Sequence, residues 1–169
     1  MKADIQALIE SAKRHREADD YIRGSFGEIV DGQFKGCSVG CTIHDIDPEA
    51  HVSDHEFLAD QLSVPVELIY FQDLFFENLE DNRDWTVDFL SAIPTTPSNV
   101  IPRFLLEIVP VVDDDYYRLT KKFLENWRDN GGKDEALRKA ARSAAESAAR
   151  LAKIKDMSET LLNIMRGEA

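Results

Sequence analysis

Residues 36–45 read GCSVGCTIHD, and this stretch holds both cysteines of the chain, two glycines and a histidine. No other stretch of the sequence concentrates as many reactive side chains. At about 100° per residue, Cys37, Cys41 and His44 would fall within an arc of about 60° on a continuous helix. The spacing therefore predicts a helix with these three residues on one face.

A zinc site is one interpretation of this face. Structural zinc takes four Cys or His ligands, and the fourth would come from a histidine of HVSDH, residues 51–55. Of its two histidines we favour the second. The predicted metal ligands are therefore Cys37, Cys41, His44 and His55, with zinc as the expected cofactor.

The two glycines bear on whether one ion could reach all of these ligands. A rise of about 1.5 Å per residue separates Cys37 from His44 by about 10.5 Å, near the limit of what one zinc ion could bridge, so the helix would have to break. Gly36 or Gly40 could supply that break, because glycine tolerates the positive φ of a turn. Alternatively, the same pair presents a smooth patch for close packing of a neighbouring helix.

Two further interpretations of the thiols stay open. Free cysteine is among the most buried residue types, so Cys37 and Cys41 are expected first of all as small core side chains. As a nucleophile, either thiol would need activation by His44, and the many acids nearby would raise a thiol pKa instead. The sequence also lacks a phosphate-binding glycine loop, a serine elbow and an HExxH motif, so we do not expect an enzyme.

Composition places the chain among ordinary globular proteins. Its 169 residues are 43% hydrophobic and 31% charged, which suits a folded domain with a real core. No run approaches the roughly 20 apolar residues that a bilayer requires, and the first ten residues lack a signal-peptide pattern. Two cysteines are too few for a disulfide scaffold, so we expect free thiols and a cytoplasmic location without membrane association.

The net charge of −12 is concentrated in the middle of the chain. Residues 36–117 hold 17 acidic side chains against two arginines, whereas residues 118–169 hold 12 basic and 8 acidic side chains. Such a field repels nucleic acid and attracts cations. We therefore expect no direct nucleic-acid binding, and either a simply solubilising surface or a face that binds a basic protein partner.

The fold class predicted from periodicity is mostly α, a helical bundle with a small β-hairpin near residues 26–36. The hairpin is indicated by Asp31-Gly32, the dipeptide of a type I′ turn, between two short strand-like runs. Helices are predicted at residues 3–20, from Ser53 or Asp54 to about 62, from Pro65 to about 79, from about 84 to Pro94, at 100–112 (with a strand as the rival), and at 113–130. The helix after Pro65 carries too many apolar residues for one stripe and should be the buried central helix.

Two groups of polar residues in these helices are expected to be structural. His15 lies in the charged run SAKRHRE, so we predict that it faces solvent. Asp113, Asp114 and Asp115 should stabilise the start of a helix through its dipole rather than bind metal, because successive residues of a helix point in different directions.

The last part of the chain predicts a long alanine-rich helix over residues 134–165. Leu137, Ala141, Ala144, Ala148 and Leu151 form a heptad seam, which then shifts to Ile154, Met157, Leu161 and Ile164. We therefore divide the chain into an acidic helical domain, 1–132, and this helix, 133–169, packed on the same domain. The seam also allows a homo-oligomer formed through the helix.

The motifs together resemble a set of uncharacterised bacterial and phage proteins. The similarity rests on GCSVGCTIHD, on SDHEFLADQLSVPVELIYFQDLFFENL, on DWTVDFLSAIP and on the AARSAAESAAR ending, and it extends from about Gly24 onward. These relatives carry a GCAVGC-type element, with alanine where this chain has Ser38, a change that by itself puts nothing in doubt. No activity is established for the set, so the resemblance implies a phage or mobile-element origin but no mechanism.

Three hypotheses on function follow from these features. The first is an acidic helical interaction protein that binds a protein partner through its acidic body or its last helix. The second is a zinc-binding protein with Cys37, Cys41, His44 and His55 as ligands. The third is a phage-related inhibitor whose acidic surface imitates nucleic acid.

Overall fold

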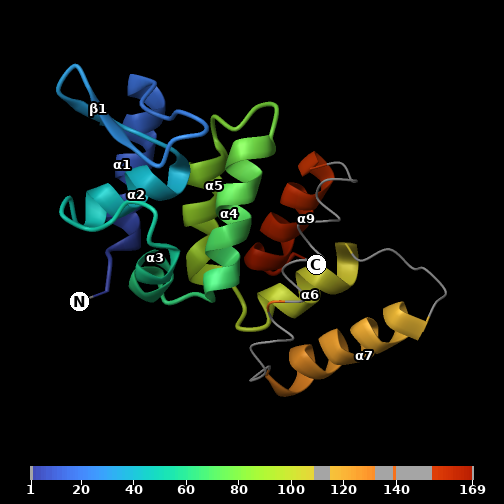
Figure 1. Cartoon of the computed structure of the whole chain (residues 1–169). Helices are drawn as coiled ribbons and strands as arrows, with labels where there is room; N and C mark the ends of the chain where they lie inside the picture. Colours follow the sequence, from blue (N-terminus) through green and yellow to red (C-terminus); the bar gives the residue numbers. More distant parts are fainter. Residues whose placement is uncertain (1, 109–114, 132–138, 140–153, 169) are drawn as a thin grey trace. The chain divides into compact units, whose positions relative to one another are not determined.

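The computed structural model describes residues 2–108, 115–131, 139 and 154–168. They form a mostly helical protein with one small two-stranded antiparallel sheet, which confirms the predicted fold class. The chain divides into two compact units, Met1–Pro94 and Thr95–Ala169. Each unit is described by itself (Figure 1).

The first unit contains the hairpin and most of the predicted helices. Its helices are α1 (Ile5–Ala18), α2 (Ser38–Ile46), α3 (His55–Leu62), α4 (Val66–Asn78) and α5 (Trp85–Ala92), followed by the 3₁₀ turn η1 (Ile93–Thr95). Side-chain caps fix two of the starts, because Asp4 accepts the N–H groups of Gln6 and Ala7 and Asp54 accepts that of Phe57. Pro65 stands at the N-cap of α4, as predicted.

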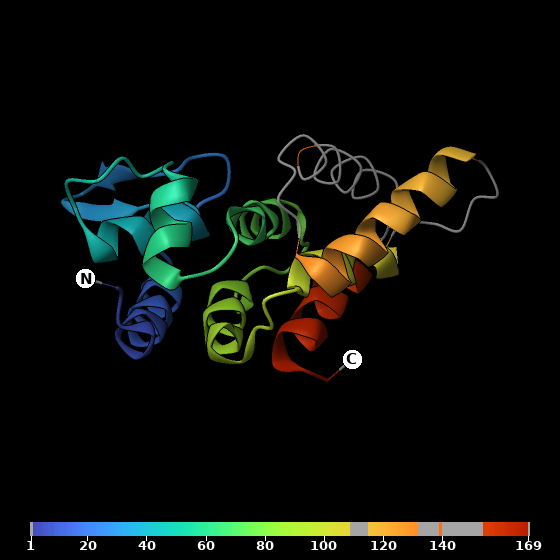
Figure 2. The same ribbon diagram turned by 90° about the horizontal axis from the view of Figure 1, so that it is seen from below.

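The core of the first unit is built around α4. This helix contacts α2, α3 and α5, while α1 contacts α2 and α5. Seen nearly end-on in Figure 2, α4 and α5 lie side by side. Four phenylalanines are fully buried here, namely Phe71, Phe75 and Phe76 of α4 and Phe89 of α5. The prediction of a buried central helix after Pro65 is therefore confirmed.

The hairpin consists of β1 (Glu28–Val30) and β2 (Gln33–Lys35), with Ile29 opposite Phe34. Asp31 and Gly32 connect the strands with φ of 52° and 82°, the left-handed values that a type I′ turn requires at both central positions. The prediction made from the Asp31-Gly32 dipeptide is confirmed.

Helix α2 begins only after Cys37, which is extended with φ −68° and ψ 173° and occupies the N-cap position. The two glycines of this segment lie against the backbone of residues 26–27, because a Cβ built on Gly36 or Gly40 would overlap the carbonyl oxygen of Phe26. The smooth patch therefore packs against the irregular segment before β1 and not against a helix.

The second unit contains α6 (Val100–Ile108), α7 (Asp115–Asn130) and α9 (Ile154–Arg166), and α6 contacts both of the others. Helix α6 settles the choice between helix and strand for residues 100–108. In α9, the shifted-seam residues Met157, Leu161 and Ile164 are at most 4% exposed, so these three positions are buried. Gly131 follows α7 with φ 74°, a left-handed residue suited to end a helix.

Several predictions fall outside the described residues. They include Asp113 and Asp114, the seam from Leu137 to Leu151, and the domain boundary at residues 132–133. Of the long helix predicted at 134–165, the structure describes residue 139 and the segment from Ile154 onward. No helix in the described ranges combines the length and the hydropathy that crossing a bilayer requires.

Candidate metal site

A pocket in the first unit brings together a thiol and two carboxyl groups. One ligand atom from each of Cys37, Asp73 and Glu77 lies within 4.8 Å of the other two. The pocket has a volume of about 270 Å³ and is completed by Gly24, Ser25 and Phe26. Two distant parts of the sequence therefore meet here, the start of α2 with the loop before the hairpin and the middle of α4.

Cys37 is held in place by backbone hydrogen bonds at the start of α2. Its N–H donates to the carbonyl of Ser25 at 2.8 Å, and its Sγ accepts the N–H of Gly40 at 3.4 Å. Burial above all, together with the carboxylates of Asp73 and Glu77, raises the pKa of the thiol to about 12, although the N–H groups of Gly40 and Val39 act in the opposite direction. Without a cation in the pocket, Cys37 is a neutral thiol and a poor nucleophile.

Asp73 and Glu77 lie one turn apart on α4 and so project from the same side of the helix. Glu77 accepts the N–H of Gly24 at 2.9 Å, which ties α4 to the loop before the hairpin. Burial raises the pKa of Glu77, and the neighbouring Asp73 raises it further. The Oδ1 atom of Asp73 is buried and accepts no hydrogen bond from the described part of the chain. The pocket therefore holds a buried carboxylate oxygen, Oδ1 of Asp73, that no donor among the described residues satisfies.

His55 supports this carboxylate pair from α3. Its Nε2 lies 3.4 Å from Oδ2 of Asp73 and its Nδ1 lies 2.9 Å from the carbonyl oxygen of Ser53. Its ring stacks on Tyr70 at 4.6 Å between centroids. Burial alone would lower the pKa of His55, but the contacts with Asp73 and the Ser53 carbonyl outweigh it and raise the pKa. His55 thus orients Asp73, the role that groups behind a metal ligand commonly have.

The structure separates the four residues that the sequence nominated as zinc ligands. Cys37 lines the pocket and His55 contacts one of its carboxylates. Cys41 is buried one turn further along α2, where its Sγ donates to the carbonyl of Gly36. His44 stacks on Phe34 with the two rings 4.0 Å apart. Among the described residues, Cys37, Asp73 and Glu77 are the metal-ligating side chains that come together in a group of three within 4.8 Å. Zinc binding by Cys37, Cys41, His44 and His55 therefore stays a prediction.

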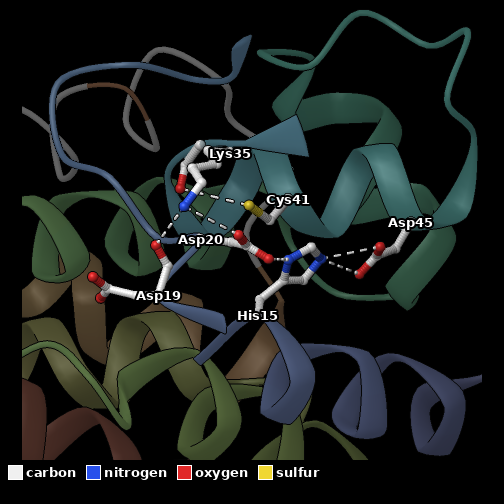
Figure 3. A network of polar contacts seen from close by, with 7 residues as sticks. His15, Asp19, Asp20, Lys35, Cys41 and Asp45 are labelled. Atoms are coloured by element: carbon white, nitrogen blue, oxygen red, sulfur yellow. Dashed lines mark hydrogen bonds and ion pairs between the residues drawn. The ribbon is translucent and has the colours of Figure 1, made fainter. Parts of the chain in front are cut away.

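A second polar cluster surrounds His15, which the sequence led us to place in solvent. That prediction is wrong, because the His15 side chain is only 13% exposed and lies between two carboxylates (Figure 3). Its Nδ1 is 3.3 Å from Asp20 and its Nε2 is 3.2 Å from Asp45. Lys35 of β2 completes the network, 3.4 Å from Asp20. These contacts connect α1 and the residue Asp20 that follows it with the end of β2 and with α2.

The pH dependence of this network follows from its pKa shifts. The hydrogen bond to Asp45 raises the pKa of His15 above 6.5, although burial opposes it. The stabilisation by His15 is therefore complete below the unfolded-state pKa and is lost as the pH rises through the folded-state pKa. Burial would raise the pKa of Asp45, but the hydrogen bonds to His15 and Ser11 outweigh it and lower the pKa, so its contribution is complete above the unfolded-state pKa and is lost as the pH falls through the folded-state pKa.

We expect His15→Gln to lower the free energy of unfolding by about 2 kcal/mol near pH 5.5, the range for hydrogen bonds to charged groups. The loss should shrink as the pH rises through the folded-state pKa of His15, because the native imidazole then becomes neutral. Urea unfolding of the variant and the wild type at several pH values measures the loss of stability and its dependence on pH. The matched control is His51→Gln, because His51 is exposed and the hydrogen bond of its side chain in the described structure is to the hydroxyl of Ser53. A loss independent of pH would contradict the assigned role of the imidazolium.

Sequence reasoning missed Asp73 and Glu77. The only local signal is that two acids four residues apart interrupt the apolar run IYFQDLFFEN of α4. Acids at such spacing also occur on ordinary exposed helix faces, so the run alone does not distinguish a site. Comparison of the chain with protein-family models, curated proteins and solved structures finds no match, and the case for this site therefore rests on its own geometry.

Proposed function

We propose that the protein binds a divalent transition metal, zinc foremost, through Cys37, Asp73 and Glu77. The observation that carries the proposal is the convergence of these three ligand atoms within 4.8 Å on the wall of a pocket. Ligands of one tetrahedral zinc ion lie about 3.5 Å apart, given bond lengths of about 2.0–2.3 Å. Modest rotation of the two carboxylate side chains, which are only partly buried, closes that difference.

The kinds of ligand favour zinc over calcium or magnesium. Zinc accepts thiolate sulfur together with carboxylate oxygen, whereas the two hard cations take oxygen ligands alone. A bound cation would also reverse the local electrostatics, because it favours the thiolate of Cys37 that the two carboxylates otherwise disfavour. Three protein ligands leave a fourth position that opens to the pocket, the arrangement in which zinc proteins hold water or an exchangeable ligand.

The test compares the two cysteines of the full-length chain, purified without an affinity tag. We expect about one zinc per chain in the wild type and in Cys41→Ser, and loss of the metal in Cys37→Ser. Both thiols are 1% exposed, so the pair is matched for burial, and serine at position 37 keeps the N-cap of α2. Elemental analysis after dialysis measures the bound metal, and circular dichroism checks the fold of each variant.

Cobalt replacement adds a test of the ligand atoms themselves. Thiolate-to-cobalt absorption should appear in the wild type, disappear in Cys37→Ser and weaken strongly in Asp73→Asn, which removes a charge at constant size. Loss of metal in Cys41→Ser or His44→Gln, with retention in Asp73→Asn, would instead support the quartet predicted from sequence. A wild-type chain that retains no metal at neutral pH would reject both sites.

A further inference from the structure

The exposed apolar side chains of the described residues gather on one short segment. The large hydrophobic side chains that are exposed are Phe26, Ile29 and Val30, at 38%, 66% and 36% exposure. All three lie within five residues of sequence, in or next to strand β1. Single exposed apolar residues are common on protein surfaces, but several on one segment usually mark a contact surface.

The backbone of β1 offers an open edge at the same place. In a two-residue hairpin the two residues that flank the turn bond to each other through their backbones. Successive pairs along the strands then alternate between non-hydrogen-bonded and hydrogen-bonded pairs. Val30 and Glu28 therefore bond to β2, whereas the N–H and C=O of Ile29 point away from it. β2 pairs with β1, and among the residues that the structure describes no further strand lies beside β1. An edge that presents both free backbone groups and an exposed isoleucine suits an added strand.

The charge of the first unit specifies the kind of strand. Residues 1–94 contain 20 acidic and 7 basic side chains, so the unit carries a net charge of −13. The basic side chains nearest β1 are engaged, since Lys35 contacts Asp20 and Arg23 donates to the carbonyls of Leu79 and Glu80. Glu28 and Asp31, in contrast, are exposed on the hairpin. A second copy of this chain would bring two strongly negative units together, so charge complementarity favours a basic partner.

We propose that β1 is a docking edge for an extended, basic segment of a partner protein. The segment pairs with Ile29 as an added strand, covers the apolar side chains of residues 26–30, and places its lysines or arginines near the hairpin acids. Backbone pairing supplies affinity and the charges supply orientation and selectivity, as in other cases of strand addition. The inference does not require bound metal, because pairing takes place along the backbone of Ile29, which is not part of the pocket, although Phe26 lines both surfaces.

The test uses two synthetic peptides of about eight residues, the length of an ordinary strand. One alternates lysine with valine and the other alternates glutamate with valine. Titration of the full-length chain followed by NMR should show binding of the lysine peptide alone, with the amide of Ile29 newly protected from hydrogen exchange. Shifts spread over the acidic surface with no protection at Ile29 would overturn the proposal, since they indicate only charge attraction.

Two variants of the edge complete the experiment. Ile29→Lys places a positive charge on the edge, which repels the lysine peptide. Ile29→Pro removes the outward N–H but keeps the hydrogen bonds between β1 and β2. Each should weaken binding at least about tenfold, or about 1.4 kcal/mol. Ile29→Thr is the control, because it keeps the strand and the N–H and should weaken binding less than either. Unchanged affinity in Ile29→Pro, or self-association of the wild type through the hairpin, would refute a basic partner strand.

Discussion

Gly40→Ala is expected to lower the free energy of unfolding by about 3 kcal/mol or more, the upper range for inserting a group into a packed region. A Cβ at this position would overlap the carbonyl oxygen and carbon of Phe26. These are backbone atoms, which cannot turn aside as the end of a flexible side chain can. Alanine would otherwise gain up to about 1 kcal/mol in helix propensity, so the measured loss is a lower limit for the steric cost.

The measurement is denaturant unfolding followed by circular dichroism, with Gly32→Ala as the control. Gly32 has φ 82° and open space around it, so alanine there meets only the conformational cost of about 1–2 kcal/mol. The comparison separates crowding from backbone strain. If Gly40→Ala costs no more than Gly32→Ala, the close approach of α2 and the segment around Phe26 does not contribute to stability. A large loss would establish that the start of α2, which carries Cys37, is fixed by this contact.

Local sequence signals were sufficient for most of the secondary structure. Asp31-Gly32 predicted its hairpin because few residue pairs adopt two successive positive φ values. Asp54 and Pro65 marked helix starts because each removes or satisfies an N–H group that a helix leaves free. These signals act within a few residues, so no knowledge of the tertiary structure was needed to read them.

The candidate site depended on contacts that no local pattern encodes. The spacing of Cys37 and Cys41 suggested one helix face, yet Cys37 precedes the helix, and the two thiols have different surroundings. His15 looked exposed because its sequence neighbours are charged, but its partner Asp45 lies 30 residues away. Asp73 and Glu77 gain significance only where α4 passes the start of α2. Each error has the same cause, since burial of a polar group is decided by distant residues.

Ser38 illustrates the point most sharply, because no local pattern in the sequence distinguishes this serine from an alanine at the same position. In the structure it is fully buried, and its Oγ accepts hydrogen bonds from Gln72 of α4 and, at 2.8 Å, from Thr86 of α5. Three helices therefore meet at one hydroxyl. Because Gln72 and Thr86 are themselves at most 1% exposed, neither can turn to water if that acceptor is removed.

Ser38→Ala should therefore lower the free energy of unfolding by about 3 kcal/mol, since unpaired buried groups cost about 1–3 kcal/mol each. Thr42→Val is the matched control, because this buried hydroxyl of α2 bonds only to a carbonyl of its own helix in the described structure and should cost less than about 1 kcal/mol. The double variant Ser38→Ala/Thr86→Val should cost less than the sum of its single changes, by about 1 kcal/mol or more. Strict additivity in this cycle, measured by urea unfolding, would mean that the hydroxyl at position 38 does not couple α2 to α5.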